Sequence, residues 1–362
     1  MTDRDGSAFM RRALDLAREG WGQTAPNPMV GAVVVRDGVA VGEGAHRRYG
    51  EAHAEIAALA AAGPRARGAT LYVTLEPCAH QGHTPPCADA IIAAGVTRVV
   101  IATRDPNPVA IGGAERLRNA GITVEIGDGE GAARELNTAF FHRFVHPERP
   151  FVTLKLAVSL DAAIAAADRS TTTHLTGPES RREVHRLRAG HDAIAVGVGT
   201  VLADDPQLTV RHWALPRVPL TRVVFDSTLR TPPGSGLVRT ARENPVLLVA
   251  RAADPARARP LEAAGVQIVV ATALSEALLL LAERGLGSLI VEGGARLAGS
   301  FLGHAVVDRL IIFQAPVVLG EGALNAFANA PSADVARLER LPVLDRRVLG
   351  DDVMTTYALG AP

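Results

Sequence analysis

The residues best suited to chemistry are the only two cysteines of the chain, Cys78 and Cys87, together with His53 and Glu55 upstream of them. Zinc binds Cys thiolates and His nitrogens, and a catalytic zinc site keeps its fourth position for water. One His, two Cys and a Glu that does not touch the metal are what a zinc deaminase requires. We therefore predict that His53, Cys78 and Cys87 bind zinc and that Glu55 passes a proton from the activated water to a leaving amine. The predicted reaction is the hydrolytic removal of an amino group from a heterocycle.

Two other interpretations of these residues stay open. The cysteines could be ordinary buried thiols, and His53 could be a surface histidine or a hydrogen-bonded core histidine that binds no metal. Alternatively, His80 or His83 could supply a fourth ligand and close a purely structural zinc site. Three protein ligands fit an open site better than a closed one.

The elements around these residues alternate between strands and helices. Cys87 is expected to begin a helix, where backbone N–H groups and the helix dipole favour a thiolate. Apolar spacing and turn residues predict helices at 8–19, 53–62, 87–94, 115–119 and 132–145, and strands at 29–35, 39–42, 71–75, 98–102 and 122–126. Alternation of this kind is typical of an α/β layer fold, in which helices cover a sheet.

A Pro-containing stretch at 146–150 interrupts the pattern, and we place a domain boundary there. The predicted domains are 1–147 and 151–362. A second α/β alternation follows, with strands at 151–159, 193–197, 222–226, 246–250, 267–271, 289–291 and 310–318, and helices at 179–188, 275–282 and 296–302. Residues 250–260 are expected to form a polar surface connection.

Composition limits the possible partners and the compartment. The 38 Lys and Arg residues balance the 38 Asp and Glu residues, so nothing favours a nucleic acid or an acidic membrane surface. Two cysteines within one motif argue against a disulfide scaffold and for a reducing compartment. No apolar run approaches the roughly 18 residues of a membrane helix. We expect a cytoplasmic protein that acts on small molecules and forms a homo-oligomer.

The spacing of the cysteines identifies a family. Zinc deaminases commonly have two residues between them, whereas eight intervene here in Glu-Pro-Cys-Ala-His-Gln-Gly-His-Thr-Pro-Pro-Cys. This form resembles the deaminase half of the bifunctional riboflavin-biosynthesis deaminase–reductases, and the resemblance extends through residues 26–31, 50–55 and 105–108. It implies a cytidine-deaminase-like three-layer α/β fold. It also implies that the phosphorylated pyrimidine substrate is held by Asn27, His46, His80, Asp105 and Asn107, although each of these could instead form a turn or a cap. Ala52 stands where Pro is common, and His83 stands where Lys or Arg is usual, so a weaker hold on the phosphate is expected.

The second half carries weaker local signals. In residues 289–298 a strand leads through Gly293-Gly294 into a helix, so that backbone N–H groups could face a phosphate, although plain turn chemistry explains the glycines equally well. Residues 151–161, 199–211 and 291–294 resemble the reductase half of the same family. That resemblance implies a dihydrofolate-reductase-like α/β fold that uses NADPH.

The same resemblance implies two sets of contacts. The NADPH contacts are Ala157, His174, Thr200, Asp204, Ser227, Gly294, Ala295, Arg296, Leu297, Ala298, Gly299 and Ser300. The substrate contacts are Thr172, Arg188, Leu208, Arg211 and Glu292. Lys155, a charged residue in an apolar strand, is a candidate catalytic group that could polarise the sugar oxygen or hold the ring-opened form. Residues 161–174 depart from the family's usual pattern, which has Asp-Gly here and often an aromatic residue near His174.

The sequence therefore predicts a fused enzyme that uses Zn²⁺ and NADPH for two consecutive steps of riboflavin synthesis. One alternative is an active deaminase whose second domain only binds a ligand. Another is a zinc-stapled binding protein without catalysis. A nucleic-acid base deaminase would need a basic face with stacking aromatics, which the balanced charge and the three tyrosines disfavour.

Overall fold

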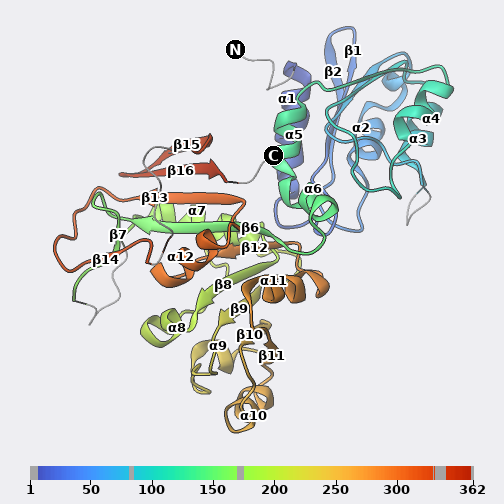
Figure 1. Ribbon diagram of the computed structural model, residues 1–362. Helices are drawn as coiled ribbons and strands as arrows, with labels where there is room; N and C mark the ends of the chain where they lie inside the picture. The colour runs from blue at the N-terminus through green and yellow to red at the C-terminus, as the bar shows by residue number, and fades with distance from the viewer. Residues whose placement is uncertain (1–6, 81–84, 169–174, 329, 331–339, 360–362) are drawn as a thin grey trace. The chain divides into compact units, whose positions relative to one another are not determined.

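The chain folds into two compact units, Met1–Val145 and His146–Pro362 (Figure 1). The computed structural model describes residues 7–80, 85–168, 175–328, 330 and 340–359. The boundary between the units falls directly before the Pro-containing stretch at 146–150.

The first unit is built on a five-stranded sheet in the order β2-β1-β3-β4-β5. Its strands are β1 Gly31–Arg36, β2 Val39–Ala45, β3 Thr70–Val73, β4 Arg98–Ile101 and β5 Thr123–Ile126. Strand β1 is antiparallel to both β2 and β3, whereas β3, β4 and β5 run parallel. The parallel strands end at a common edge, from which the loop after β3 carries Cys78.

Helices cover both faces of this sheet, which makes three layers. The helical segments are α1 Ala8–Ala17, η1 Arg18–Gly20, α2 Ala54–Ala62, η2 Gly63–Ala66, α3 Cys87–Ala94, α4 Gly113–Asn119, α5 Glu130–Leu136 and α6 Thr138–Val145. Side chains alternate along a strand, so Ala32 and Val34 pack with α2, α3 and α4, and Val33 and Val35 pack with α1 and α5. Gly44 lets α2 lie close to β2, because a Cβ there would come within 2.4 Å of the Ala54 carbonyl oxygen. This close packing fixes the start of α2, next to His53 and Glu55.

The helix predicted at 132–145 is in fact two helices, so that prediction is wrong. Asn137 separates α5 from α6, and its side chain accepts a hydrogen bond from the Met29 N–H at 2.8 Å and donates one to the Met29 carbonyl at 2.8 Å. An Asn side chain bonded to a distant backbone in this way offers an alternative to continuing the helix. The break redirects α6.

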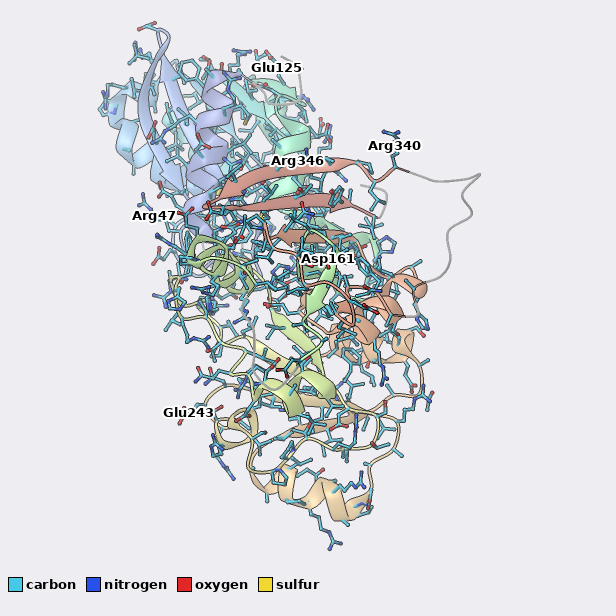
Figure 2. All side chains as sticks on the ribbon, turned by 90° about the vertical axis from the view of Figure 1, so that its left-hand side faces the viewer. Arg47, Glu125, Asp161, Glu243, Arg340 and Arg346 are labelled. Atoms are coloured by element: carbon cyan, nitrogen blue, oxygen red, sulfur yellow. The ribbon has the colours of Figure 1, made fainter. Side chains whose placement is uncertain are left out.

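The second unit has a nine-stranded sheet in the order β11-β10-β9-β8-β12-β6-β13-β16-β15. Its strands are β6 Phe151–Val158, β8 Ala193–Gly197, β9 Thr221–Phe225, β10 Val246–Ala250, β11 Gln267–Val270, β12 Ser288–Val291, β13 Arg309–Gln314, β15 Val343–Leu349 and β16 Asp352–Ala358. All neighbours pair in parallel except β13 with β16 and β16 with β15. Short strands β7 Ala163–Ala165 and β14 Leu324–Asn325 pair separately. Arg346, labelled in Figure 2, lies on the edge strand β15.

Helices again lie on both faces. They are α7 Pro178–Ala189, α8 Val198–Asp204, α9 Gly236–Arg239, α10 Pro255–Ala263, α11 Leu274–Glu283 and α12 Ala295–Gly303. Buried residues of α7 to α10 share one core cluster with Ile194 and Val224, and those of α11 and α12 share the other with Ala193 and Val223. Parallel strands covered on both faces should be apolar throughout, as β10 is, since all five of its residues are buried.

Two predictions for this unit were wrong. Residues 250–260 are not a simple connection, because Asp254 caps α10 through a bond from the Ala256 N–H and Pro255 occupies its first turn. The strand predicted at 310–318 ends at Gln314, just before Pro316, which has no N–H to donate.

Candidate active sites

The three residues predicted to bind zinc come together in the first unit. The His53 Nδ1 atom lies 3.2 Å from Cys87 Sγ and 3.7 Å from Cys78 Sγ. The Cys87 N–H also donates to Cys78 Sγ at 3.3 Å. One ligand atom from each residue lies within 4.8 Å of the others, and the described residues contain no other such group of His, Cys, Asp and Glu. This donor set of one imidazole and two thiols is one that zinc prefers.

Local structure explains how these side chains meet. Cys87 begins α3, as predicted, so its thiol sits at the positive end of the helix. His53 was predicted as the first residue of a helix, and it is instead the N-cap of α2, in an extended conformation with φ −68° and ψ 157°. Gly113 allows α4 to approach the loop before Cys78, because a Cβ there would lie 1.7 Å from the Pro77 carbonyl oxygen.

Glu55 lies in the first turn of α2 and is 4% exposed. Burial raises the pKa of Glu55 to about 6, while the neighbouring His53 acts to lower it. Glu55 lines the same cavity as His53 and Cys78 and is not part of the three-residue ligand group. A carboxyl group in this position can accept and return a proton without binding the metal.

A cavity of about 250 Å³ opens beside the ligand group. All five residues predicted to contact the deaminase substrate line it, namely Asn27, His46, His80, Asp105 and Asn107. Asn27 Nδ2 lies 3.4 Å from His46 Nε2, and His46 Nδ1 lies 3.1 Å from the Ala52 carbonyl oxygen. Burial lowers the pKa of His46, so its ring is neutral at pH 7.

Asp105 and Asn107 also shape the loop that carries them. The Asn107 N–H donates to Asp105 Oδ1 at 2.8 Å, and the Val109 N–H donates to Asn107 Oδ1 at 3.1 Å. The alternative role as turn-formers is therefore realised as well, and it does not conflict with their place in the cavity. Burial raises the pKa of Asp105 to about 6.

Two further residues of this cavity were given no role from the sequence. Glu76 is 3% exposed, and its Oε1 accepts from the Gly112 N–H at 3.2 Å and the Ala114 N–H at 3.0 Å, at the start of α4. Its place in the Glu-Pro-Cys motif was an available signal. Arg143 of α6 also lines the cavity. No sequence signal pointed to Arg143, because its position depends on the helix break at Asn137.

A second cavity, of about 400 Å³, lies in the second unit. Five of the predicted reductase residues line it, namely Lys155, Ala157, Arg188, Arg211 and Glu292. Glu292 accepts from Arg188 at 2.6 and 3.0 Å, and its Oε2 lies 3.6 Å from Lys155 Nζ. Burial acts to raise the pKa of Glu292, but the charges of Arg188 and Lys155 outweigh it and hold that pKa at about 2. Burial lowers the pKa of Lys155, and Glu292 opposes this effect.

The residues predicted to contact NADPH follow the carboxyl ends of neighbouring parallel strands. Ala157 lies in β6, Thr200 and Asp204 lie in α8 after β8, Ser227 follows β9, and Gly294 to Ser300 follow β12. Gly294 caps α12, and a Cβ there would lie 4.0 Å from Thr200 Oγ1, which brings two of these segments together. Ligands of open α/β sheets bind at this edge. Apart from Ala157, none of these residues lines the 400 Å³ cavity.

Three predicted positions stand apart from these groups. Leu208 is 4% exposed, has φ 52° and packs in a core cluster rather than in the lining of the cavity. Thr172 and His174 lie outside the described residues.

The second cavity also contains residues that the sequence did not reveal, among them Arg181, His185 and His212. His185 Nδ1 accepts from the Arg211 N–H at 3.2 Å, and its ring stacks edge-on against His212 with centroids 4.9 Å apart. Burial lowers the pKa of His185 to about 4, helped by the charges of Arg188 and Arg211. His185 is on the same helix as Arg188, but nothing in the helical pattern marks it as part of a site.

A three-layer α/β unit with an open His-Cys-Cys group defines a zinc-dependent deaminase, and the second unit adds a mostly parallel sheet with a basic cavity. Residues 3–103 match the sequence model of the cytidine and deoxycytidylate deaminase zinc-binding region. Residues 150–348 match that of the RibD C-terminal domain. The chain thus joins a deaminase to a reductase.

Whole-length relatives give the same result. A riboflavin biosynthesis protein RibD from Aquifex aeolicus is 46% identical over 96% of this chain and 97% of its own length. The structure of RibD from Acinetobacter baumannii, form 1, has a TM-score of 0.83 at 38% identity, with 97% of each chain covered. A deaminase–reductase structure from Thermotoga maritima also has a TM-score of 0.83, at 36% identity and 97% coverage of each chain.

The chain belongs to the RibD family of bifunctional riboflavin-biosynthesis enzymes. It is an enzyme with a hydrolytic deaminase activity and a reductase activity, and its cofactors are zinc and NADPH. The predicted family, the two fold classes and the bifunctional activity are confirmed. None of the helices in the described part of the chain combines the length and the apolar character needed to span a bilayer.

Proposed function

We propose that domain 1–147 removes an amino group from 2,5-diamino-6-(5-phosphoribosylamino)pyrimidin-4-one by hydrolysis. Domain 151–362 then reduces the ribosyl group of the product to a ribityl group. The Thermotoga maritima relative is named a diaminohydroxyphosphoribosylaminopyrimidine deaminase and 5-amino-6-(5-phosphoribosylamino)uracil reductase, which supports this choice of substrates. The observation that carries the deaminase assignment is the ligand group within 4.8 Å beside the buried Glu55.

In this proposal His53, Cys78 and Cys87 would hold a zinc ion, which would act as a Lewis acid and lower the pKa of water bound to it to about 7. Glu55 would accept a proton from the attacking water and return it to the departing amine. Its burial supports the role, because a carboxyl with a pKa of about 6 is suited both to accept and to donate a proton near neutral pH.

The cavity residues would orient the pyrimidine. Asn27 and His46 are paired with each other, and the neutral His46 ring can donate or accept a hydrogen bond. His80 has a buried Nδ1 atom that finds no partner among the described residues, so a bound ligand is a candidate partner. Asp105 and Asn107 add polar groups from the loop after β4.

The reductase cofactor would lie along the edge where β6, β8, β9 and β12 end. NADPH supplies the hydride for this step. Thr200, Asp204 and Ser227 offer polar side chains there, and residues 294–300 offer the backbone N–H groups at the start of α12. Ala157 would pack against the cofactor. His174 belongs to the same proposed set but lies outside the described residues.

The reductase substrate would occupy the 400 Å³ cavity. Lys155 is placed to contact the sugar oxygen or the ring-opened form, with Glu292 fixing its ammonium group. Arg188 holds Glu292, and Arg211 faces the cavity as a phosphate partner whose guanidinium fork matches phosphate oxygens. Leu208 and Thr172 complete the proposed set. Leu208 would contribute through its backbone.

We extend the proposal to the assembly and the compartment. Strand β15 is an edge strand whose exposed Val343, Leu344 and Val348 flank the charged Asp345, Arg346 and Arg347, and its open edge could pair with a second copy of the chain. A homo-oligomer would be disrupted by Val348→Arg, as measured by light scattering.

Zinc-binding thiols persist in a reducing compartment, which supports a location in the cytoplasm.

The test of the catalytic roles compares wild type with Glu55→Gln and Lys155→Met. Zinc content, ammonia release from the diaminopyrimidinone and NADPH oxidation with the deaminated product are measured on each protein. Glu55→Gln should keep one zinc and lose ammonia release, and Lys155→Met should lose NADPH oxidation alone. Zinc without ammonia release from the wild type would instead mean a structural metal.

A further inference from the structure

The charges around the deaminase cavity are unevenly distributed. Its lining includes four carboxylates, which belong to Glu51, Glu55, Glu76 and Asp105. Among the described residues of the lining there is one guanidinium, that of Arg143, and no lysine. Among these side chains, Arg143 would attract a phosphate group that entered the cavity, whereas the carboxylates would repel it.

Arg143 is held in place by its surroundings. Its guanidinium carbon lies 4.4 Å from the centroid of the Phe140 ring and 4.9 Å from that of Phe144, on the same helix. Its Nη1 atom donates to the Pro26 carbonyl oxygen at 2.9 Å, directly before Asn27 of the cavity. Stacking on aromatic rings and a bond to a carbonyl restrict the side chain, so little conformational entropy remains to be lost when a ligand binds.

The position of Arg143 connects it to the residues proposed to orient the pyrimidine. The charge of Arg143 acts to lower the pKa of Asp105, against the larger effect of burial, so the two groups lie within electrostatic range of each other. Phe140, on which Arg143 stacks, lines the same cavity. A substrate whose ring lies at Asn27 and Asp105 would therefore have Arg143 and Phe140 of α6 within reach of its substituents.

We propose that Arg143 binds the phosphate of the deaminase substrate and makes this site selective for a phosphorylated pyrimidine. This inference rests on the proposed function of the first domain. A guanidinium has five N–H donors in a planar fork, which matches two phosphate oxygens. The sequence has His83 where a Lys or Arg is usual in the family, and Arg143 carries the permanent positive charge that a histidine lacks.

The test uses the zinc-loaded full-length protein and two substrates, the phosphorylated diaminopyrimidinone and the same compound after phosphatase treatment. Wild type should deaminate the phosphorylated form with the higher kcat/KM. Arg143→Met should lower kcat/KM for that form on the order of 10- to 100-fold, as expected for the loss of a charge-assisted hydrogen bond. It should lower kcat/KM for the dephosphorylated form much less. Comparing two proteins on two substrates isolates the pairwise interaction, as a double-mutant cycle does.

Arg134→Met is the matched control. Arg134 also stacks on a phenylalanine, with its guanidinium carbon 4.8 Å from the Phe141 centroid, but it does not line the cavity. Arg134→Met should keep the preference of the wild type for the phosphorylated substrate. Arg143→Lys should restore part of the preference that Arg143→Met loses. Zinc content and Tm are measured on every variant, and both should match wild type.

The other outcomes overturn the proposal. An equal loss with both substrates would mean that Arg143 acts only through the shape of the cavity, and no loss with either would place the phosphate elsewhere. Either result leaves the deaminase assignment intact, because wild type would still release ammonia. If wild type deaminates neither compound, the proposed function of the domain is wrong and the inference falls with it.

Discussion

Glu292 and Arg188 form a two-bond ion pair in the second unit, with Nε donating to Oε1 at 2.6 Å and Nη2 donating to Oε2 at 3.0 Å, although 104 residues separate them. Their side chains are 10% and 13% exposed. Removing two charges from water is costly, so a buried pair is weak evidence of a purely stabilising role. This pair instead places a third charge, Lys155, in the wall of a cavity.

Glu292→Gln should damage both stability and reduction. It leaves Arg188 and Lys155 buried without their counter-charge, which is expected to lower the free energy of unfolding of the second unit by about 3 kcal/mol. The kcat/KM for NADPH oxidation with the deaminated product should fall at least roughly tenfold, since charged hydrogen bonds in the cavity are lost. Thermal melting and steady-state kinetics measure the two effects, and ammonia release should not change.

Glu183→Gln provides the control for that experiment. Glu183 accepts from Arg186 at 2.8 Å and from Arg347 at 2.6 Å, and it does not line the cavity. Its loss should lower Tm and leave the reductase kcat/KM as it is. Equal kinetic losses in the two variants would show that Glu292 affects activity only through stability.

The second unit should lose stability as the pH falls from about 6.5 to 4, because His191 and His185 both have a pKa lowered to about 4. Burial lowers the pKa of His191 to about 4, with a further contribution from Arg309. Its Nδ1 lies 2.7 Å from the Leu187 carbonyl and its Nε2 2.9 Å from Thr153 Oγ1, so the neutral ring donates to the first and accepts from the second. The unfolded chain binds the proton more readily than the folded one, so stability is present above pH 6.5 and declines below it, by at most about 3 kcal/mol for His191 alone.

Urea unfolding at a series of pH values checks this expectation. His191→Gln should remove part of the decline between pH 6.5 and 4, and His304→Gln, at an exposed position, should not. An unchanged slope in His191→Gln would assign the acid sensitivity of this unit to other groups.

The sequence was most informative where local signals are strong. The helix predicted at 87–94 has the bounds of α3, because Cys87 follows Pro86 and the helix ends at Gly95, which has φ 73°. The zinc ligands were identifiable because few other roles require these residue types together. The start of α10 was also marked, by Asp254 and Pro255, and was overlooked.

Other features depend on contacts between residues far apart in the chain. The apolar pattern of a helix continues through Asn137, and only its bonds to Met29 explain the break. That break in turn decides where Arg143 lies. Strand β15 was missed because most of its residues are exposed, so it has no alternation of buried and exposed positions. The pairing of Glu292 with Arg188 has no counterpart in sequence spacing, and only the family resemblance grouped them.

Removal of zinc should separate the two activities. All three zinc ligands belong to the first unit, so a chelator should abolish ammonia release and leave NADPH oxidation with the deaminated product unchanged. Because zinc binds the folded site and stabilises it, the chelated protein should also melt at a lower temperature in the transition of the first unit alone. Calorimetry with and without added zinc measures this shift. A chelator that inhibits both activities would place a metal requirement in the second unit.

Gly113→Ala should disturb the zinc site through the backbone. An added Cβ would lie 1.7 Å from the Pro77 carbonyl oxygen, so α4 and the loop before Cys78 must move apart. We expect a lower zinc content, a lower Tm and reduced ammonia release, although no ligand is changed. Gly131→Ala is the matched control, because Gly131 lies exposed in α5 with nothing within 4 Å of an added Cβ. It should raise stability by roughly 0.5–1 kcal/mol through helix propensity and keep full zinc. Full zinc content in Gly113→Ala would mean that the loop adapts and that the contact between α4 and Pro77 does not position Cys78.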